Sequence, residues 1–351
     1  METAQVKLRL KMNLHWHRNL RIRRRLEMQN REKEDGYKGL LVTNAFLRTG
    51  KFVEHYEWLR EAALQRGMTL DIIENAERLL MIEEEPAWLS EYDFVIYWDK
   101  DIPYGKCLSM FADRYQIPVL NSVESVGVCD DKCETYLRLA AWNAAHPKEK
   151  IRLLPTIPAP MTYANIGYTK TDFLDKVEER LGYPMIVKEC FGSFGMQVYM
   201  AQDRKMLEQL TGKLGGKPFL YQKYHQYSSG RDVRLQVVGC EVVAAMERYS
   251  KNGDFRANIT NGGSMKPYTP SKEECSLAVL TAQILGLDFC GVDLLFDEES
   301  GRADIVCEVN SNAHFKNIHT CTGVNVAEKI MEHILKFLED RKQAPAGTVF
   351  P

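Results

Sequence analysis

Two apolar segments, GVDLLF at residues 291–296 and ADIVCEVN at residues 303–310, flank the polar linker DEESGR at residues 297–302. Residues such as Asp, Ser and Gly favour turns, and apolar runs on either side of a turn are typical of paired strands. The segments therefore predict an antiparallel hairpin. If the hairpin folds symmetrically about Ser300 and Gly301, position 293 lies opposite position 308.

This hairpin would bring three oxygen-bearing side chains together. Glu308 and Asn310 are two positions apart, so both project from one face of their strand, and Asp293 would join them there. Two carboxylates and an amide oxygen suit Mg²⁺ that is held partly by protein and partly by nucleotide phosphates. Taken alone, the same residues would equally fit the polar outer face of a sheet, so the metal hypothesis depends on the rest of the chain.

A lysine and a glycine-bearing loop lie upstream. The predicted strand at residues 185–188 ends in Lys188, and the sequence Gly-Ser-Phe-Gly follows at residues 192–195. Glycines let backbone N–H groups approach phosphate oxygens, and a lysine adds a fixed positive charge. The lysine precedes the glycines, which excludes a Walker loop. A β-turn beside a lysine is the alternative interpretation.

Arginines follow on two further predicted strands and the loop after them. Arg234 and Arg248 belong to the strands at 232–238 and 241–248, and Arg256 comes shortly afterwards. We expect all three to surround phosphate and carboxylate oxygens, which guanidinium groups bind in a bidentate manner. Each arginine by itself would also be compatible with an ordinary surface position.

The remaining pattern alternates strands and helices. Such alternation indicates parallel α/β layering in the N-terminal part, where no G-x-G-x-x-G follows the first strand, so a dinucleotide site is not supported. Prolines between residues 147 and 160 mark a domain boundary. The other predicted strands are 39–44, 69–73, 92–98, 117–121, 197–201 and 219–222, and the predicted helices are 53–63, 107–115, 130–145, 171–181, 203–211, 271–285 and 323–340.

Bulk properties narrow the classes of function. A chain of 351 residues with 45% hydrophobic residues is long enough for two or three domains, and a net charge of −2 does not call for a polyanion partner. Nine cysteines without zinc spacing predict reduced thiols. No apolar run of 18 residues and no signal-peptide core is present, so we expect a cytoplasmic protein without membrane association. The sequence leaves the oligomeric state, including a homo-oligomer, open.

Residues 1–36 differ from the rest, because they hold ten Lys and Arg residues against five acids. We expect a solvated, poorly ordered extension, or translated sequence upstream of a true start at Met12 or Met28. A basic arm that binds nucleic acid is the alternative.

The motifs in their order resemble the ATP-grasp superfamily and, within it, the RimK-like carboxylate–amine ligases of the alpha-L-glutamate type. The resemblance is most specific from Arg231 to Ala327 and extends more loosely back to about Gly39. It is carried by Lys132, PMIVKECFGSFGMQV at 184–198, YQKY at 221–224, RDVRLQVVGCEVVAAMER at 231–248, GDFRAN at 253–258, NGG at 261–263, GVDLLF at 291–296, CEVNSN at 307–312 and TGVNVA at 322–327.

The resemblance implies a fold and a set of roles. The fold is α/β (α+β), with a Rossmann-like pre-ATP-grasp domain at 37–128, a linker helix and lid at 129–224, an antiparallel-sheet subdomain at 225–340 and a tail at 341–351. The implied nucleotide-binding residues are Lys132, Lys188, Gly192, Ser193, Phe194, Gly195, Gln222, Lys223, Tyr224, Asp232 and Arg234. The residues implied to lie beside the acyl-phosphate are Arg248, Arg256 and Asn258. The implied magnesium ligands are Asp293, Glu308 and Asn310.

The implied activity is the ATP- and Mg²⁺-dependent joining of a carboxylate to an amine through an acyl-phosphate, with Mn²⁺ as an alternative metal. The amine would be an amino acid such as glutamate, and the acceptor a peptide, a protein or a small metabolite. Two departures stand out: family members often carry Glu where Gln222 stands, and Ser-Pro-Gly where this chain has residues 311–313. Nearby, His314 and Lys316 would contact a substrate carboxylate or serve only as loop residues. Rival hypotheses are an ATP-grasp kinase and a non-catalytic ATP-binding or nucleic-acid-binding protein.

Overall fold

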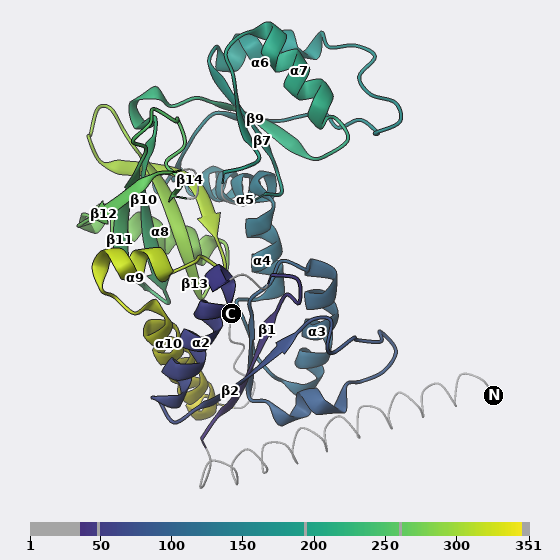
Figure 1. The fold of residues 1–351 in the computed structure, drawn as a ribbon, viewed down its shortest axis with the longest axis vertical. Helices are drawn as coiled ribbons and strands as arrows, with labels where there is room; N and C mark the ends of the chain where they lie inside the picture. The colour runs from purple at the N-terminus through teal and green to yellow at the C-terminus, as the bar shows by residue number, and fades with distance from the viewer. Residues whose placement is uncertain (1–35, 48–49, 193–194, 260–261, 346–351) are drawn as a thin grey trace, which may run out of the picture.

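The computed structural model describes residues 36–47, 50–192, 195–259 and 262–345. Three sheets follow one another along the long axis of the molecule. The small sheet that contains β7 and β9 lies at one end, and the sheet that contains β1 and β2 lies at the other (Figure 1). The predicted N-terminal arm up to residue 35 and the tail from residue 346 lie outside the described residues.

The first sheet is parallel, as predicted. Its strands have the order β2-β1-β3-β4, and every neighbouring pair is parallel. Strand β1 is almost entirely buried, as expected for a parallel sheet that is covered on both faces. The elements are β1 (Lys38–Thr43), α2 (Gly50–Leu64), β2 (Thr69–Glu74), η1 (Ala87–Glu91), β3 (Phe94–Tyr97), α3 (Ile102–Tyr115) and β4 (Val119–Leu120).

Two helices connect this sheet to the rest of the chain. They are α4 (Val123–Asp130) and α5 (Lys132–Ala145), where the sequence predicted one helix over 130–145. The break falls at Asp131, whose carboxylate accepts hydrogen bonds from the backbone N–H groups of Cys133 (2.8 Å) and Glu134 (3.2 Å). This N-cap starts α5 and therefore places Lys132 in its first turn.

The second sheet is small and antiparallel, with the order β6-β9-β7-β8. Its helices cover one face and enclose a separate core that includes Leu174, Val187 and Phe219. The elements are β6 (Thr156–Pro158), α6 (Phe173–Leu181), β7 (Met185–Glu189), β8 (Val198–Ala201), α7 (Arg204–Leu214) and β9 (Phe219–Lys223).

The third sheet has six strands in the order β12-β11-β10-β13-β14-β5. The predicted hairpin is confirmed as β13 and β14, and Asp293 pairs with Glu308 as predicted. The turn itself is not symmetric about Ser300 and Gly301, since Phe296 pairs with Ala303 and two register shifts bring Asp293 opposite Glu308. Its elements are β5 (Arg152–Leu153), η2 (Gln226–Ser228), β10 (Arg231–Val238), β11 (Glu241–Tyr249), β12 (Ser264–Pro267), α8 (Lys272–Ile284), β13 (Phe289–Phe296), β14 (Ala303–Asn310), α9 (Lys316–Thr322) and α10 (Val326–Gln343).

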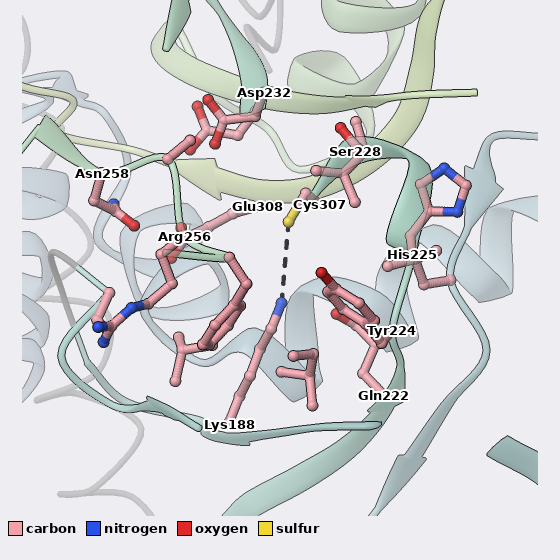
Figure 2. Close-up of a pocket in the computed structure, with 18 of the residues that line it drawn as sticks. Lys188, Gln222, Tyr224, His225, Ser228, Asp232, Arg256, Asn258, Cys307 and Glu308 are labelled. Atoms are coloured by element: carbon pink, nitrogen blue, oxygen red, sulfur yellow. Dashed lines mark hydrogen bonds between the residues drawn. The ribbon is translucent and has the colours of Figure 1, made fainter. Parts of the chain in front are cut away.

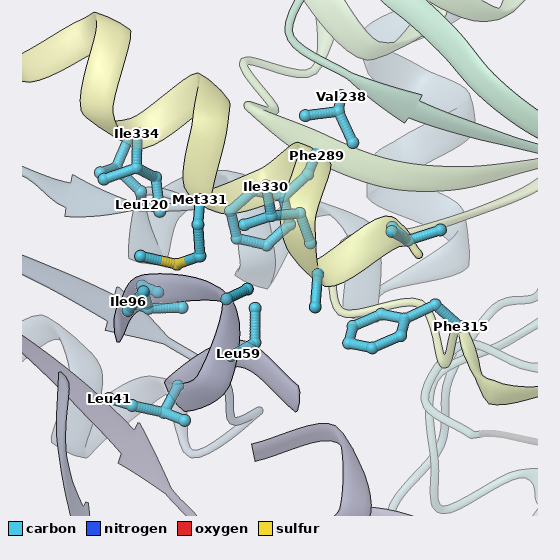
Figure 3. Packing of buried hydrophobic residues seen from close by; sticks show 14 of the residues in the cluster. Leu41, Leu59, Ile96, Leu120, Val238, Phe289, Phe315, Ile330, Met331 and Ile334 are labelled. Atoms are coloured by element: carbon cyan, nitrogen blue, oxygen red, sulfur yellow. The ribbon is translucent and has the colours of Figure 1, made fainter. Parts of the chain in front are cut away.

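The parallel sheet and the six-stranded sheet share one hydrophobic core. Leu59 and Ile96 from the first sheet's layer pack with Phe289 and with Ile330 of α10, as Figure 3 shows. Asn121, fully buried after β4, adds polar links by donating to the carbonyls of Phe289 (2.8 Å) and Ser311 (3.0 Å). The two sheets are therefore held in a fixed relation. The domain boundaries drawn from the sequence stay predictions.

Candidate active site

A first cavity lies between the small antiparallel sheet and the six-stranded sheet. It encloses about 870 Å³ of space, of which part is open to solvent at its mouth. Of the residues predicted from the sequence it is lined by Lys132, Lys188, Gly192, Gly195, Gln222, Lys223, Tyr224, Asp232, Arg248, Arg256, Asn258, Asp293 and Glu308. Ser193 and Phe194 lie outside the described residues.

Two lysines reach this cavity from different elements. The ammonium group of Lys132 donates to the carbonyl of Gly192 (2.9 Å) and lies 3.4 Å from a carboxylate oxygen of Glu308. Lys188 points from β7 across the cavity towards Cys307, whose sulfur is 4.0 Å from its nitrogen (Figure 2). Lys188 is only 9% exposed, and no carboxylate contacts it among the residues that the structure describes. Buried charges are normally paired, so this lysine is suited to an anionic ligand.

The sequence did not single out Cys307. Neighbouring side chains in a regular strand point to opposite faces, so Cys307 would point away from Glu308. The strand pairing skips Cys307, however, because Asp293 pairs with Glu308 and Leu294 pairs with Val306. This β-bulge re-aims the side chain, so that Cys307 and Glu308 both line the cavity. Burial raises the pKa of the Cys307 thiol to about 11, which keeps it protonated and leaves Lys188 without an anionic partner there.

Behind the two lysines lies a network of two aspartates and two arginines. Arg234 binds Asp293 through two hydrogen bonds (2.7 and 2.6 Å), and Arg248 binds Asp232 in the same way (2.7 and 2.7 Å). Arg248 also contacts Asp293 at 2.9 Å, which joins the two pairs. The adjacent strands β11, β10 and β13 place these side chains side by side. The network is electrically balanced.

The environment moves the pKa values of the two aspartates in opposite directions. Burial raises the pKa of Asp232, although Arg248 opposes it. Burial acts on Asp293 as well, but Arg234 and Arg248 together outweigh it and hold its pKa below the usual range. Arg248 is buried, yet Asp232 and Asp293 keep its pKa above the ordinary value. Asp293 is therefore ionised at neutral pH.

The predicted metal trio fits a hard cation. Asp293 and Glu308 are paired across the hairpin, and Asn310 follows two positions later. A carboxylate has about four lone-pair positions, and the arginines occupy three of those on Asp293, so one remains for a metal ion. The amide nitrogen of Asn310 is buried without a hydrogen-bond partner in the described chain. No three His, Cys, Asp or Glu residues gather as a metal site in the described ranges, so nucleotide oxygens would have to complete the coordination.

The predicted hinge residues at the end of β9 border the first cavity. The side chain of Gln222 is buried and donates to the hydroxyl of Thr156 (2.9 Å), and its backbone is paired with Thr156 of β6 and Ile186 of β7. Lys223 and Tyr224 line the cavity directly. Beyond them, His225 is a lining residue that the sequence did not indicate, and its ring nitrogen contacts the carbonyl of Phe296 at 2.7 Å.

Arg256 connects the two sides of the cavity. It donates to the carbonyl of Gly195 (3.0 Å) in the glycine-bearing loop and forms an ion pair with Asp254 (2.8 Å). The hydrogen bonds from Arg256 lower the pKa of Asp254. Asn258 lies two residues further on. The segment that carries Arg256 and Asn258 therefore lines the cavity and contacts the glycine-bearing loop of the small sheet.

A second cavity adjoins the first. It shares Arg248, Asn258 and Glu308 with the first cavity, and it contains Arg234 and Asn310, the two predicted residues that do not line the first. Its other lining residues are Leu47, Phe52, Tyr56, Trp98, Asp99, Lys100, Cys129, Met246, Ile259, Ser311, Asn312, Ala313, His314 and Asn317. Lys316 does not line it and instead pairs with Glu54 on the surface.

Comparison with solved structures defines the class of protein. The chain superposes on the solved structure of an ATP-grasp ligase, PsnB, in complex with a phosphomimetic variant of a minimal precursor, Mg and ADP. The TM-score is 0.61 over 86% of this chain and 98% of that one, at 14% sequence identity. The chain therefore has the ATP-grasp fold that the sequence predicted.

The family described as the RimK-like ATP-grasp domain matches residues 141–334, more than half of the chain. The chain belongs to this family. A probable alpha-L-glutamate ligase of Methanococcoides burtonii is 39% identical, covering 79% of this chain and 90% of that protein. A ribosomal protein bS6–L-glutamate ligase of Shigella boydii is 29% identical, covering 80% and 91%. The family resemblance is thereby confirmed, and these two relatives are named as glutamate ligases. No helix of the described chain is both long and apolar enough to cross a membrane.

Proposed function

We propose that this protein is an ATP- and Mg²⁺-dependent ligase, cytoplasmic as predicted, that joins a carboxylate to an amine through an acyl-phosphate. The amine is an amino acid such as glutamate, and the carboxylate belongs to a peptide, a protein or a small metabolite. The names of the relatives support the class of amine. The peptide precursor bound to PsnB supports a peptide as one kind of acceptor.

One observation carries this proposal. Lys188 is a buried cation that faces the first cavity and contacts a neutral thiol there. Leaving such a charge unpaired destabilises the folded protein, so a polyanionic ligand at this place would regain that free energy. Lys132 and Arg256 reach the same cavity, where their partners are backbone carbonyls and carboxylates that a phosphate chain would replace. A nucleotide triphosphate matches this set of cations.

The residues around the junction of the two cavities suit the two chemical steps. A carboxylate oxygen attacks the γ-phosphorus, the bond to the bridging oxygen breaks, and ADP leaves. The amine nitrogen then attacks the acyl carbon and loses a proton, while phosphate departs with the electron pair of the broken C–O bond. Arg248 and Asn258 border both cavities and would hold the carboxylate and the transferring group. Magnesium, held by Glu308, Asn310 and the remaining lone pair of Asp293, would neutralise phosphate charge.

The proposal is tested by ADP release from ATP with a panel of amino acids and peptide carboxylates, followed by mass spectrometry of the product. A ligase gives a condensed product and needs both substrates for turnover. A phosphorylated carboxylate that accumulates without an amine would indicate a kinase instead. The absence of ATP binding would refute the proposal altogether.

A matched pair of lysine variants tests the role of Lys188. Lys188→Met keeps the length of the side chain but removes the charge, and we expect it to weaken ATP binding by about tenfold or more. Lys217→Met is the control, because Lys217 is exposed and pairs with Glu189 away from the cavity. It should bind ATP as the unaltered protein does. Equal affinities of the two variants would contradict the role of Lys188.

A further inference from the structure

The second cavity has two chemically different walls. The wall from the six-stranded sheet carries Arg234, Arg248 and Glu308. The opposite wall comes from α2 and the end of β3, and it presents the aromatic rings of Phe52, Tyr56 and Trp98 together with Asp99. Aromatic faces and a carboxylate attract positively charged groups, so the second wall is suited to a cation.

Asp99 is a buried carboxylate whose hydrogen-bond partners are all neutral. It is 5% exposed and accepts from the backbone N–H of Lys100 (2.7 Å) and from the amides of Asn44 (3.2 Å) and Asn75 (3.4 Å). Burial raises the pKa of Asp99 despite these hydrogen bonds. The neighbouring Lys100 directs its ammonium group to Asp130, 2.6 Å away. The negative charge on this wall therefore has no cationic counterpart among the described residues.

The cations that line the cavity in the described part of the chain already have carboxylate partners. Lys100 pairs with Asp130, and Arg234 and Arg248 form the balanced network with Asp232 and Asp293. An additional anion at the aromatic wall would lie close to the carboxylate of Asp99. None of these residues would offer it a cation that lacks a carboxylate partner. This wall is therefore poorly suited to a second carboxylate group and well suited to a hydrogen-bond donor.

Unused acceptors follow on the loop after β14. The hydroxyl of Ser311, which is 2% exposed, and the side-chain oxygen of Asn312 are buried without hydrogen-bond partners in the described chain. The amide nitrogen of Asn312 donates to the backbone carbonyl of Asp99 (3.4 Å), which leaves the oxygen as the unsatisfied atom. An unsatisfied buried acceptor is costly, so a donor is expected to reach it when the site is filled.

The loop is held in place by the parallel-sheet part of the chain. A ring nitrogen of His55 accepts from the backbone N–H groups of Phe315 (3.0 Å) and Lys316 (3.2 Å), and Asn121 binds the carbonyl of Ser311 (3.0 Å). Phe315 also belongs to the shared core in Figure 3. The acceptors of Ser311 and Asn312 are thus kept near Asp99 by a rigid frame.

We propose that the second cavity receives the amine co-substrate in its protonated form, with the ammonium group bound to Asp99, Ser311 and Asn312. This inference rests on the proposed ligase function and assigns one of its two substrates to a place. The ammonium supplies three N–H donors and a positive charge, which match the acceptors and the uncompensated carboxylate on this wall. Asp99 is then the residue that selects an amine over an isosteric neutral group.

The test compares amino acids with their 2-hydroxy-acid counterparts, in which a hydroxyl replaces the ammonium group. Binding of L-glutamate, L-leucine and L-lysine and of their hydroxy counterparts to the full-length protein is measured by calorimetry, with Mg²⁺ and a non-hydrolysable ATP analogue present. We expect the amino acid that binds to do so about tenfold more tightly than its hydroxy counterpart. Equal binding of the pair, or no binding of any amino acid while the nucleotide binds, overturns the inference.

Two adjacent variants give opposite expectations. Asp99→Asn keeps the shape but removes the charge, and it should reduce the tenfold preference to about threefold or less. Lys100→Met removes the neighbouring cation and should leave the preference intact or increase it. If the Lys100 variant lost the preference and the Asp99 variant kept it, a substrate carboxylate would occupy this wall and the inference would be wrong. Ser311→Ala provides a second reduction of the preference if the Asp99 variant does not fold.

Failure of this inference is distinguishable from failure of the ligase proposal. Binding of the ATP analogue is measured first in the same samples. A protein that binds the nucleotide but does not distinguish amines from hydroxy acids contradicts the role of Asp99 alone. A protein that does not bind the nucleotide contradicts the proposed function.

Discussion

Replacing Arg248 with methionine provides a quantitative test of the charge network. Arg248 forms the two hydrogen bonds to Asp232, so Asp232 loses this cationic partner in the variant. Asp293 is still bound by Arg234 after the change. Removing one partner of a buried ion pair costs about 3–5 kcal/mol, since a charge remains buried without compensation. The side chain of Asp232 retains 14% exposure at the cavity, so water compensates part of its charge. We therefore expect a loss of about 3 kcal/mol at neutral pH.

The assay is urea unfolding followed by tryptophan fluorescence and circular dichroism. Burial raises the pKa of Asp232 even with Arg248 present, and without the arginine it must rise further. A carboxyl with a raised pKa in the folded state opposes folding only where it is ionised, so the loss should shrink as the pH falls towards 5. The double variant Asp232→Asn with Arg248→Met should be more stable than Arg248→Met alone.

The matched control is Arg204→Met on the surface. Arg204 contacts three carboxylates, those of Asp175, Glu178 and Glu208, but in partly exposed positions, and such pairs contribute less than about 1 kcal/mol. A loss for Arg248→Met no larger than that of the control would refute the argument, as would a loss that does not change with pH.

Three further predictions concern other parts of the molecule. Asn121→Ala removes four buried hydrogen bonds to residues 288, 289 and 311 and should lower the free energy of unfolding by roughly 2–5 kcal/mol in urea titrations. Glu308→Gln keeps the shape of the proposed metal ligand but removes its charge, so the Mg²⁺ concentration for half-maximal ADP release should rise about tenfold or more; an unchanged requirement would exclude Glu308 as a ligand. Burial raises the pKa of Asp99 above 3.8, so ionisation of Asp99 costs stability as the pH rises through that range. The difference in melting temperature between Asp99→Asn and the unaltered protein should therefore grow in favour of the variant as the pH rises above about 4, and a constant difference would contradict the assignment.

The fold was predictable where the signals are local. The β13–β14 hairpin follows from two apolar runs and one turn, whereas its pairing of Asp293 with Glu308 also depends on two register shifts that the sequence did not indicate. The parallel strands follow from the alternation of apolar runs with helices. Strands β5, β6 and β12 were not predicted, because each has only two to four residues, and β5 and β6 in addition exist through pairing with strands far away in the sequence.

Local signals also explain a boundary that was wrong. The helix predicted over 130–145 corresponds to α5, which begins two residues later because the capping carboxylate of Asp131 starts it, and the separate helix α4 before it was not predicted. The acidic residue before Lys132 was a visible capping signal, but the helical pattern on both sides of it concealed the break. Helix α9 was also missed, since it has seven residues and follows a loop.

The candidate site was predictable as a set of residues but not as an arrangement. The order of the motifs identified most of the lining of the first cavity. It did not show that Arg234 and Arg248 bind Asp293 and Asp232, because these contacts depend on the register of three strands. The second cavity was not visible in the sequence, as its walls come mainly from Leu47, Phe52 and Tyr56, from residues 98–100, and from residues 310–314 with Asn317, which only the tertiary structure brings together.

The contacts of Lys132 have a consequence for the rate of turnover. Its ammonium group holds the carbonyl of Gly192 and lies near Glu308, so a ligand must displace these partners to bind. After the reaction the same partners compete with the departing phosphate groups for the lysine, which lowers the residence time of the products. In the proposed ligase, Gly192 and Glu308 would thus restore the starting arrangement after each cycle, and product inhibition would be weaker than the number of cations around the cavity alone suggests.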